Sequence, residues 1–334
     1  MCIIFVAHQV HPRYPLIIAS NRDEVLDRPT QPMEVWTTGR ASDGVAKSTR
    51  AKEGQHRRRL SLSGRDLVAG GTWLGITLPS RDAYDRLDGD NEDADSENPR
   101  GDSIDAPISL SWIAITNFRE EEKHGRPSRG GLLMEYLDGG NASASSFVSG
   151  LRERGRDYNG FNLLVGDNAG IYYYGNRVEG DEPPKKLSKG IHGLSNGLLE
   201  SHWWKVERGK KLLQEICSKD AEETKSSARI FHETLMEELL SDQTQPDSDE
   251  ELAETFLDMS IERYLSSIFV PKGMLLCKDY GTISSTTILV DLEDKVSVLE
   301  RTWHCKGGAR DRWFEFGSRG TSKLDGTLLS QTCK

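Results

Sequence analysis

The sequence has 334 residues, 36% of them hydrophobic and 29% charged, with a formal net charge of −10 at pH 7. This composition is typical of a soluble protein with a sizeable core. No apolar run approaches the roughly 18–20 residues that span a bilayer. The apolar run at residues 3–7 lacks the basic flank of a signal peptide, so we expect neither a transmembrane segment nor secretion by the usual route.

The negative charge is concentrated in one segment. Ten acidic residues and two arginines lie between Asp82 and Asp105, a balance of −8 that leaves −2 for the remaining chain. The segment has too few apolar residues to form a core. We therefore predict a low-complexity insertion at about 79–107. We expect no nucleic-acid partner, because the chain carries no dominant basic surface.

The N-terminal part of the chain is predicted to form a β-hairpin. Residues 2–8 contain the buried-strand run Ile3-Ile4-Phe5-Val6, and residues 15–19 have a second strand pattern after a turn. Residues 20–24 follow and are too polar for a core, so we predict a charged turn there. Because antiparallel strands return the chain to its starting edge, this turn is expected beside the first residues.

Strand and helix patterns fill the rest of the chain. Further strands are predicted at about 70–76, 110–116, 161–165, 171–174, 286–291 and 296–300. Helices are predicted at 132–137, at 144–154 and over most of 202–265. Polar stretches at about 40–67 and 241–254 are predicted to be further low-complexity insertions. Strands at both ends with helices between them predict an α+β fold in a single domain over 1–334.

Metal and nucleotide motifs are missing from the sequence. The cysteines are five, scattered and without a Cys-x-x-Cys pair: Cys2, Cys217, Cys277, Cys305 and Cys333. This predicts neither a disulfide framework nor a zinc site and fits a reducing compartment. The histidines lack metal-binding spacing, and Gly70-Gly71 lacks the phosphate-binding spacing. We expect no metal; a haem could still be held through a single histidine, which leaves no sequence signal.

Cys2 is distinguished by its position. Aminopeptidases remove Met1 when the next residue is small, and the chain would then begin with a thiol and an α-amine on one residue. The α-amine titrates at about 7.7–8.0, so it can act as a base near neutral pH. Nucleophile and base on one residue is the logic of the N-terminal-nucleophile hydrolases. Position alone favours the simpler interpretation, a small apolar residue that begins a strand.

The charged segment that follows the hairpin changes this balance. We expect Arg22 to favour the thiolate of Cys2, and Asp23 or Glu24 to hold the α-amine. On spacing alone these residues are also compatible with a solvated turn.

The chain resembles the NRDE family, which is named after the tetrapeptide Asn21-Arg22-Asp23-Glu24 and whose best known members are the transport and Golgi organisation protein 2 group. The N-terminal segment 1–5 matches the family as well. Further matching segments occur in family order at 28–30, 70–75, 116–119, 128–130, 158–163, 192–196, 280–282 and 286–291. Together they cover nearly the whole chain, and the predicted insertions lie between them.

The N-terminus of the family is in turn similar to the cysteine-type N-terminal-nucleophile hydrolases. That resemblance implies a four-layer αββα sandwich with Cys2 as the nucleophile and no required cofactor. The other site residues that it implies are Arg22, Asp23, Thr72 and Asn196, of which Thr72 and Asn196 correspond to oxyanion donors. Asp23 corresponds only approximately in spacing, and a late arginine of those enzymes has no counterpart.

Three hypotheses about the function remain open at this point. The family resemblance implies a role in ER–Golgi organisation and protein secretion, through a small hydrophobic or acyl ligand, with haem as a further cargo. It also implies a cytoplasmic protein that associates with Golgi or mitochondria. The alternative is a cysteine amidohydrolase or thioesterase that acts on a small non-peptide acyl substrate. A third, simpler hypothesis is a scaffold that acts through its inserted loops. Whether the chain is an enzyme, and its oligomeric state, are not predicted.

Overall fold

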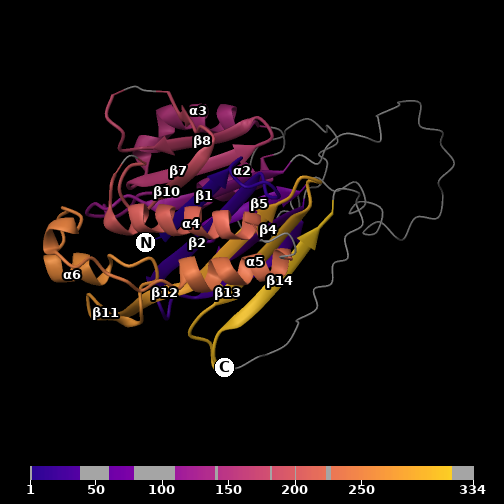
Figure 1. The fold of residues 1–334 in the computed structure, drawn as a ribbon. Coiled ribbons are helices and arrows are strands. Elements are labelled where there is room, and N and C mark those ends of the chain that lie inside the picture. Colours follow the sequence, from indigo (N-terminus) through magenta and orange to yellow (C-terminus); the bar gives the residue numbers. More distant parts are fainter. Residues whose placement is uncertain are drawn as a thin grey trace.

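A computed structural model of the chain describes residues 2–37, 60–78, 110–139, 142–180, 183–199, 201–222 and 227–317, with Cys2 described by its backbone. The strands form two antiparallel sheets, here called sheet A and sheet B (Figure 1). Sheet A has the order β10 (Gly190–Leu194), β1 (Cys2–His8), β2 (Leu16–Val25), β12 (Lys278–Val290), β13 (Val296–Thr302) and β14 (Arg310–Phe316), with β11 (Gly273–Leu275) paired to β12. Sheet B has the order β3 (Thr30–Thr37), β4 (Leu60–Asp66), β5 (Leu74–Leu78), β6 (Ser111–Asn117), β7 (Phe161–Asp167), β8 (Gly170–Gly175) and β9 (Lys185–Lys186).

Helices cover the outer face of each sheet. α2 (Gly130–Asp138) and α3 (Ala144–Arg154) pack on sheet B, and the short helix η1 (Gly155–Asp157) follows α3. α4 (Trp204–Glu222), α5 (Ala228–Thr234) and the π-helix η2 (Leu235–Leu240) pack on sheet A, as Figure 1 shows for α4 and α5. η3 (Asp249–Glu251) and α6 (Met259–Tyr264) lie in the connection to β11. The predicted α+β class, with helices between terminal groups of strands, is therefore confirmed.

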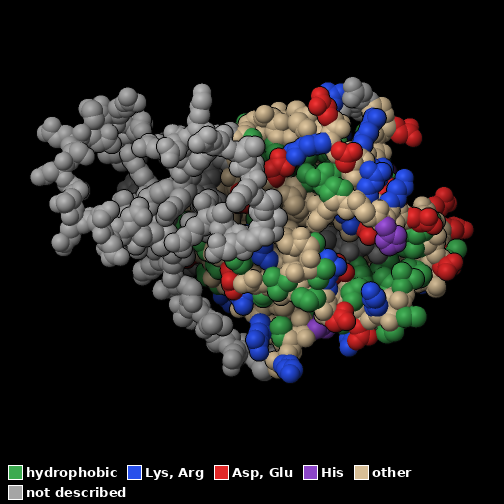
Figure 2. Space-filling model, turned by 180° about the vertical axis from the view of Figure 1, so that it is seen from behind, with side chains coloured by type: hydrophobic (Ala, Val, Ile, Leu, Met, Phe, Trp, Pro, Cys, Tyr) green, Lys and Arg blue, Asp and Glu red, His purple; other side chains and the backbone are tan. Residues whose placement is uncertain are grey.

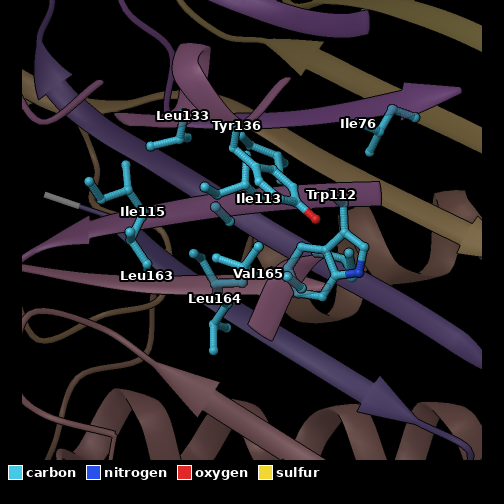
Figure 3. Packing of buried hydrophobic residues seen from close by; sticks show 14 of the residues in the cluster. Ile76, Trp112, Ile113, Ile115, Leu133, Tyr136, Leu163, Leu164 and Val165 are labelled. Carbon is cyan, nitrogen blue, oxygen red and sulfur yellow. The ribbon is translucent and has the colours of Figure 1, made fainter. Parts of the chain in front are cut away.

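Sheet B is apolar on both faces, because each of its central strands alternates between two cores. Ile113 of β6 and Val165 of β7 are register partners and lie on the outer face, against Tyr136 of α2 (Figure 3). Trp112 and Leu164 point to the opposite face, toward sheet A. Such strands have no polar face, which is typical of a sheet that is covered on both sides.

The inner face of sheet A changes from apolar to polar along its strands. One row across the sheet, at Val6, Ile18, Ile288 and Val298, belongs to the hydrophobic cluster shared with sheet B. Two residues nearer the start of β1, the corresponding row contains Ser20, Thr286 and Glu300, all buried. The space between the sheets is therefore apolar at one end and polar at the end where Cys2 lies.

Two expectations from the sequence need correction. Residues 20–24 do not form a turn: β2 continues to Val25, and Ser20, Asn21, Arg22 and Asp23 are buried. Their polar groups are satisfied by residues distant in sequence, which no local pattern reveals. The insertion predicted at 40–67 ends earlier, because residues 60–66 form β4 between β3 and β5.

Of the other two predicted insertions, the structure describes one. Residues 241–254 are described and include η3, and Asp242 accepts hydrogen bonds from Arg208 of α4. The segment at 79–107 lies outside the described residues.

Candidate functional site

Strand β2 carries the Asn-Arg-Asp-Glu segment, and its alternation sends the four side chains to two different faces of sheet A. Arg22 points between the sheets, where its partners Thr30 and Asp66 belong to sheet B. Asn21 points to the helical side, where its amide donates to the carbonyl oxygens of Leu240 (2.8 Å) and Ile268 (2.9 Å). The segment thus forms hydrogen bonds from sheet A to sheet B on one face and to the helical layer on the other.

Arg22 is a buried cation with fixed geometry. Its side chain is 5% exposed, Nη1 donates to Thr30 Oγ1 at 2.8 Å, and Nη2 donates to Asp66 Oδ2 at 3.3 Å. The guanidinium carbon lies 4.1 Å from the ring centroid of Trp73. A planar guanidinium suits this combination of stacking and directed donation better than an ammonium does.

Cys2 is the register partner of Arg22 in the antiparallel pair β1–β2. The predicted proximity of the N-terminal residue to the charged segment is therefore present in the backbone. It arises from strand pairing, whereas the sequence predicted a turn.

Asp23 lies on the face opposite to Arg22. It is 1% exposed, and its Oδ1 accepts a hydrogen bond of 2.6 Å from Thr282. Burial raises the pKa of Asp23, while the nearby charge of Lys205 counteracts that rise. Arg22 and Asp23 therefore lie on opposite faces of sheet A, and the role of Asp23 as a partner of the α-amine stays a prediction.

Thr72 immediately precedes Trp73, the residue whose ring stacks on the Arg22 guanidinium. Its hydroxyl donates to Leu74 O at 3.1 Å, and its backbone N–H donates to Gly130 O at 3.4 Å. Gly71 allows this approach, because a Cβ there would overlap the backbone of Gly130 at the start of α2. Both polar hydrogens of Thr72 are thus engaged within the protein.

Asn196 follows β10, which is the other neighbour of β1. The last register pair is Ile4 with Leu194, so Asn196 lies two residues beyond the end of β10, on the side of Cys2. The Asn196 side chain is fully buried and donates to Asn117 O at 2.8 Å. Cys2, Arg22 and Asn196 thus occupy neighbouring chain segments at one end of sheet A.

Two buried charged groups near this end were missed by the sequence analysis. Glu300 is fully buried between the sheets, its Oε2 accepts from the Met33 N–H at 2.8 Å, and burial raises its pKa to about 7. Arg119 forms an ion pair with Glu262, and its backbone N–H donates to Asn196 O at 2.8 Å. The sequence carries one signal for Glu300: in the alternation of residues 296–300, this charged residue stands at a position where an apolar residue is expected.

Neither a metal-binding cluster nor a helix able to span a membrane is found in the described ranges of the structure. In the ranges that it describes, no three His, Cys, Asp or Glu side chains are grouped so that they could hold a metal ion. None of the helices in those ranges combines the length and the apolar character that crossing a membrane requires. The face in Figure 2 shows acidic and basic side chains interspersed over the described part.

The transport and Golgi organisation 2 family model matches residues 1–84 and 109–305. The chain belongs to this family. It is 28% identical over 325 residues to a transport and Golgi organization protein 2 homolog of Bos taurus, covering 94% of this chain and 96% of the relative. It is 27% identical to the transport and Golgi organization 2 homologs of Mus musculus (93% and 96% covered) and Homo sapiens (90% and 93%). The resemblance that the Asn-Arg-Asp-Glu segment indicated is confirmed for the transport and Golgi organisation 2 family.

Proposed function

We propose that the chain acts in transport and Golgi organisation, as the names of its relatives indicate, by holding a small acyl or otherwise hydrophobic ligand at Cys2. The relatives align over at least 90% of either chain, so the match concerns the whole protein. The observation that carries the site is the register pair of Cys2 with the buried Arg22. On this proposal the protein is cytoplasmic and associates with Golgi or mitochondrial membranes.

The Arg22 site suits a ligand with a carbonyl or anionic group. A guanidinium held by Thr30, Asp66 and Trp73 keeps its orientation without a ligand, so binding loses little side-chain entropy. Such a preorganised cation favours negative charge, whether on a thiolate, a carboxylate or a developing oxyanion. Haem, which carries carboxylates, is a further cargo under this proposal.

The finer fold assignment also belongs to this proposal. The order helices, sheet, sheet, helices and the N-terminal residue at the start of a central strand support the four-layer sandwich of the N-terminal-nucleophile hydrolases. The polar end of the inter-sheet space lies at that residue, which is where a hydrolase of this type needs its site.

A second candidate is hydrolysis of a small linear amide or thioester, and the position of the buried Asn196 just beyond the end of the β1–β10 pairing favours it. The Cys2 sulfur would bond to the acyl carbon while its α-amine takes the thiol proton and passes it to the leaving amine or thiol. Water would then cleave the acyl-thioester, releasing the acid and restoring the thiol. Asn196 and Thr72 are the oxyanion donors in this scheme, each contributing about 3–4 kcal/mol; both would have to exchange their present protein partners for substrate.

Intact-mass spectrometry with an acyl thioester separates these functions. If the protein only binds the ligand, Met1 is removed and no acid is released, whether or not a stable acyl adduct forms on Cys2. Hydrolysis predicts a transient adduct on Cys2 and continuous acid release, both lost in Cys2→Ala. Unchanged acid release by Cys2→Ala would exclude the hydrolase. Wild-type affinity of Cys2→Ala and Arg22→Met for the thioester would exclude a Cys2-centred site.

A further inference from the structure

Exposed hydrophobic side chains gather at one end of the molecule. This end, here called the Cys2 end, is the one at which β1 begins and β2 and β4 end. Val10 and Leu292 are exposed in turns at the opposite end, and Ile230 is exposed on α5. The other large exposed hydrophobic residues of the described part lie on three protrusions of the Cys2 end: Leu67, Val68, Phe256, Met259, Met274 and Leu276. Apolar groups gathered in this way mark an interaction surface, whereas single ones do not.

The first protrusion is the hairpin of β11 and β12. Tyr280 pairs with Val25, the last residue of β2, and the hairpin continues past that point. Its strands pair up to Leu275 and Lys278, so the turn consists of Leu276 and Cys277 alone. The hairpin therefore projects beyond the Cys2 end, and Figure 1 shows β11 there, at the same end as the N-terminus.

The turn of this hairpin has an unusual sequence for its backbone. Leu276 has a φ of 49° and Cys277 a φ of 63°, so both are left-handed. Two-residue turns with two positive φ angles favour glycine and asparagine, because a larger side chain is strained there. Leu276 is also 79% exposed, so it gains no packing in return. The fold thus gives no reason for a leucine at the tip, whereas contact with an apolar partner does.

The second protrusion is the turn after β4, which carries Leu67 and Val68. Asp66 Oδ1 accepts from the N–H groups of Val68 and Ala69, both at 3.0 Å. The other oxygen of the same carboxylate accepts from Arg22. Asp66 therefore fixes both the turn and the guanidinium, and the two exposed side chains lie at the edge of the proposed site.

The third protrusion is the start of α6. Leu257 and Ile261 pack on the small cluster formed by Leu265, Val270 and Tyr280, whereas Phe256 and Met259 remain exposed. α6 is held at the Cys2 end by the buried ion pair of its Glu262 with Arg119, whose backbone N–H donates to Asn196 O. In Figure 1, α6 lies next to β11.

We propose that these three protrusions insert into the interfacial layer of a lipid bilayer, so that the Cys2 end faces the membrane. The inference rests on the proposed function, because an acyl ligand for Cys2 would come from the membrane. Separate protruding side chains suit a lipid surface, which yields to each of them, whereas a protein partner needs a complementary hollow for every one.

The charges beside the protrusions are mixed. Lys272 and Asp279 form an ion pair of 2.9 Å in the hairpin, and Asp258 precedes α6. The surface therefore lacks the cluster of basic residues that directs proteins to anionic lipids. Apolar insertion is then the main source of affinity, and binding is expected to depend little on salt.

Flotation with phosphatidylcholine vesicles tests the proposal. The full chain is expected to float with the vesicles, also in about 0.5 M salt. Leu67→Asn/Leu276→Asn is expected to lower the partition coefficient by about tenfold or more, because two apolar anchors are lost. Leu276→Asn alone should weaken binding by about threefold or more, with an unchanged or raised melting temperature, since asparagine tolerates the left-handed backbone.

Leu292→Asn is the matched control, because Leu292 is 71% exposed and lies in a turn at the opposite end. It is expected to bind within about twofold of wild type. Absence of vesicle binding by the wild type, or equal weakening by Leu292→Asn, would overturn the proposal. Self-association that Leu276→Asn abolishes, without vesicle binding, would also overturn it and identify a second copy as the partner.

Cys2→Ala distinguishes this surface from the site at Cys2. Vesicle binding is expected to persist in Cys2→Ala, and its loss would overturn the proposal, because the lipid would then be held by the Cys2 site itself. The proposed function is tested separately with a soluble acyl thioester, so its failure leaves the vesicle measurement intact.

Discussion

Arg22 contacts both sheets and lies next to Cys2, the centre of the proposed site. Its guanidinium reaches Thr30 and Asp66 in sheet B from a strand of sheet A, and Cys2 lies opposite its backbone. The sequence identified Arg22 as a site residue but predicted a charged turn around it instead of a buried strand. Its partners and those of Asn21 come from distant parts of the chain, and such long-range satisfaction of polar groups has no local pattern.

Replacing Arg22 is expected to reduce stability strongly. Arg22→Ala leaves Asp66 with less compensation and empties the space above Trp73, so we expect a loss of about 3 kcal/mol in the free energy of unfolding. Arg22→Lys should lose about 1–2 kcal/mol, because an ammonium cannot stack and donate in the same geometry.

Denaturant unfolding measures these losses, and Arg28→Ala is the matched control. Arg28 also donates to Asp66, at 2.7 Å, but its side chain is 30% exposed. We expect about 1 kcal/mol or less for that change. A larger loss for Arg28→Ala than for Arg22→Ala would show that burial does not determine the role of Arg22.

Glu300 is expected to make stability depend on pH. Its folded-state pKa of about 7 lies above the ordinary 4.5, so the fold favours the protonated form. The stabilising contribution is complete below pH 4.5 and is lost as the pH rises through 7. The total is of the order of 3 kcal/mol.

Glu300→Gln removes this titration. The variant should be more stable than wild type at pH 8, and the difference should shrink toward pH 5. Chemical denaturation at both pH values measures it, with Glu293→Gln as control, because Glu293 is exposed and its charge is not among those that act on Glu300. The hypothesis fails if the difference between Glu300→Gln and wild type is the same at both pH values.

At the level of elements, periodic patterns predicted the strands and helices whose residues alternate clearly. The hairpin 161–174 and the helix 144–154 are observed at nearly the predicted bounds. The hairpin predicted at 286–300 is also observed, but its first strand, β12, already begins at Lys278. β4 was missed because its sequence is rich in Ser and Gly, and β10 because glycines and a histidine interrupt it. Both strands are stabilised by pairing with neighbours, which outweighs their weak intrinsic preference.

The packing of α4 on β1 depends on a glycine inside the helix. A Cβ added at Gly209 would overlap the ring of Phe5, whereas one added at Gly150 of α3 meets nothing within 4 Å. Alanine normally stabilises a helix relative to glycine by about 1 kcal/mol. Gly150→Ala should therefore raise the melting temperature. Gly209→Ala should lower the free energy of unfolding by about 1–3 kcal/mol, because it forces α4 away from the sheet. Stabilisation by Gly209→Ala in thermal unfolding would contradict this packing.

For the whole molecule, the order of layers could be inferred from the family resemblance but not from the elements alone. The periodic patterns predicted the α+β class correctly. They do not determine which strands share a sheet. The pairing of β2 with β12 joins residues more than 250 positions apart and defines the centre of sheet A. The polar end between the sheets follows from that pairing.

The acidic segment gives a test at this scale. The family match omits residues 85–108, and β5 and β6 are antiparallel neighbours on either side of that segment. Deleting 85–108 leaves 79–84 and 109–110 to connect the two strands. We expect the melting temperature to change by about 2 °C or less, since loop length has a small effect on stability. Loss of cooperative unfolding would show that the segment is needed for the fold, and loss of a cellular role with intact folding would favour the scaffold hypothesis.

The central claim is that Cys2, freed by removal of Met1, forms a reactive site beside Arg22. Time-resolved mass spectrometry of the native protein with limiting iodoacetamide at pH 7 tests it most directly, with the exposed Cys277 as an internal reference. The account predicts that Met1 is absent and that Cys2 is alkylated about tenfold or more faster than Cys277. Retention of Met1, or a Cys2 rate no faster than that of Cys277, would contradict it.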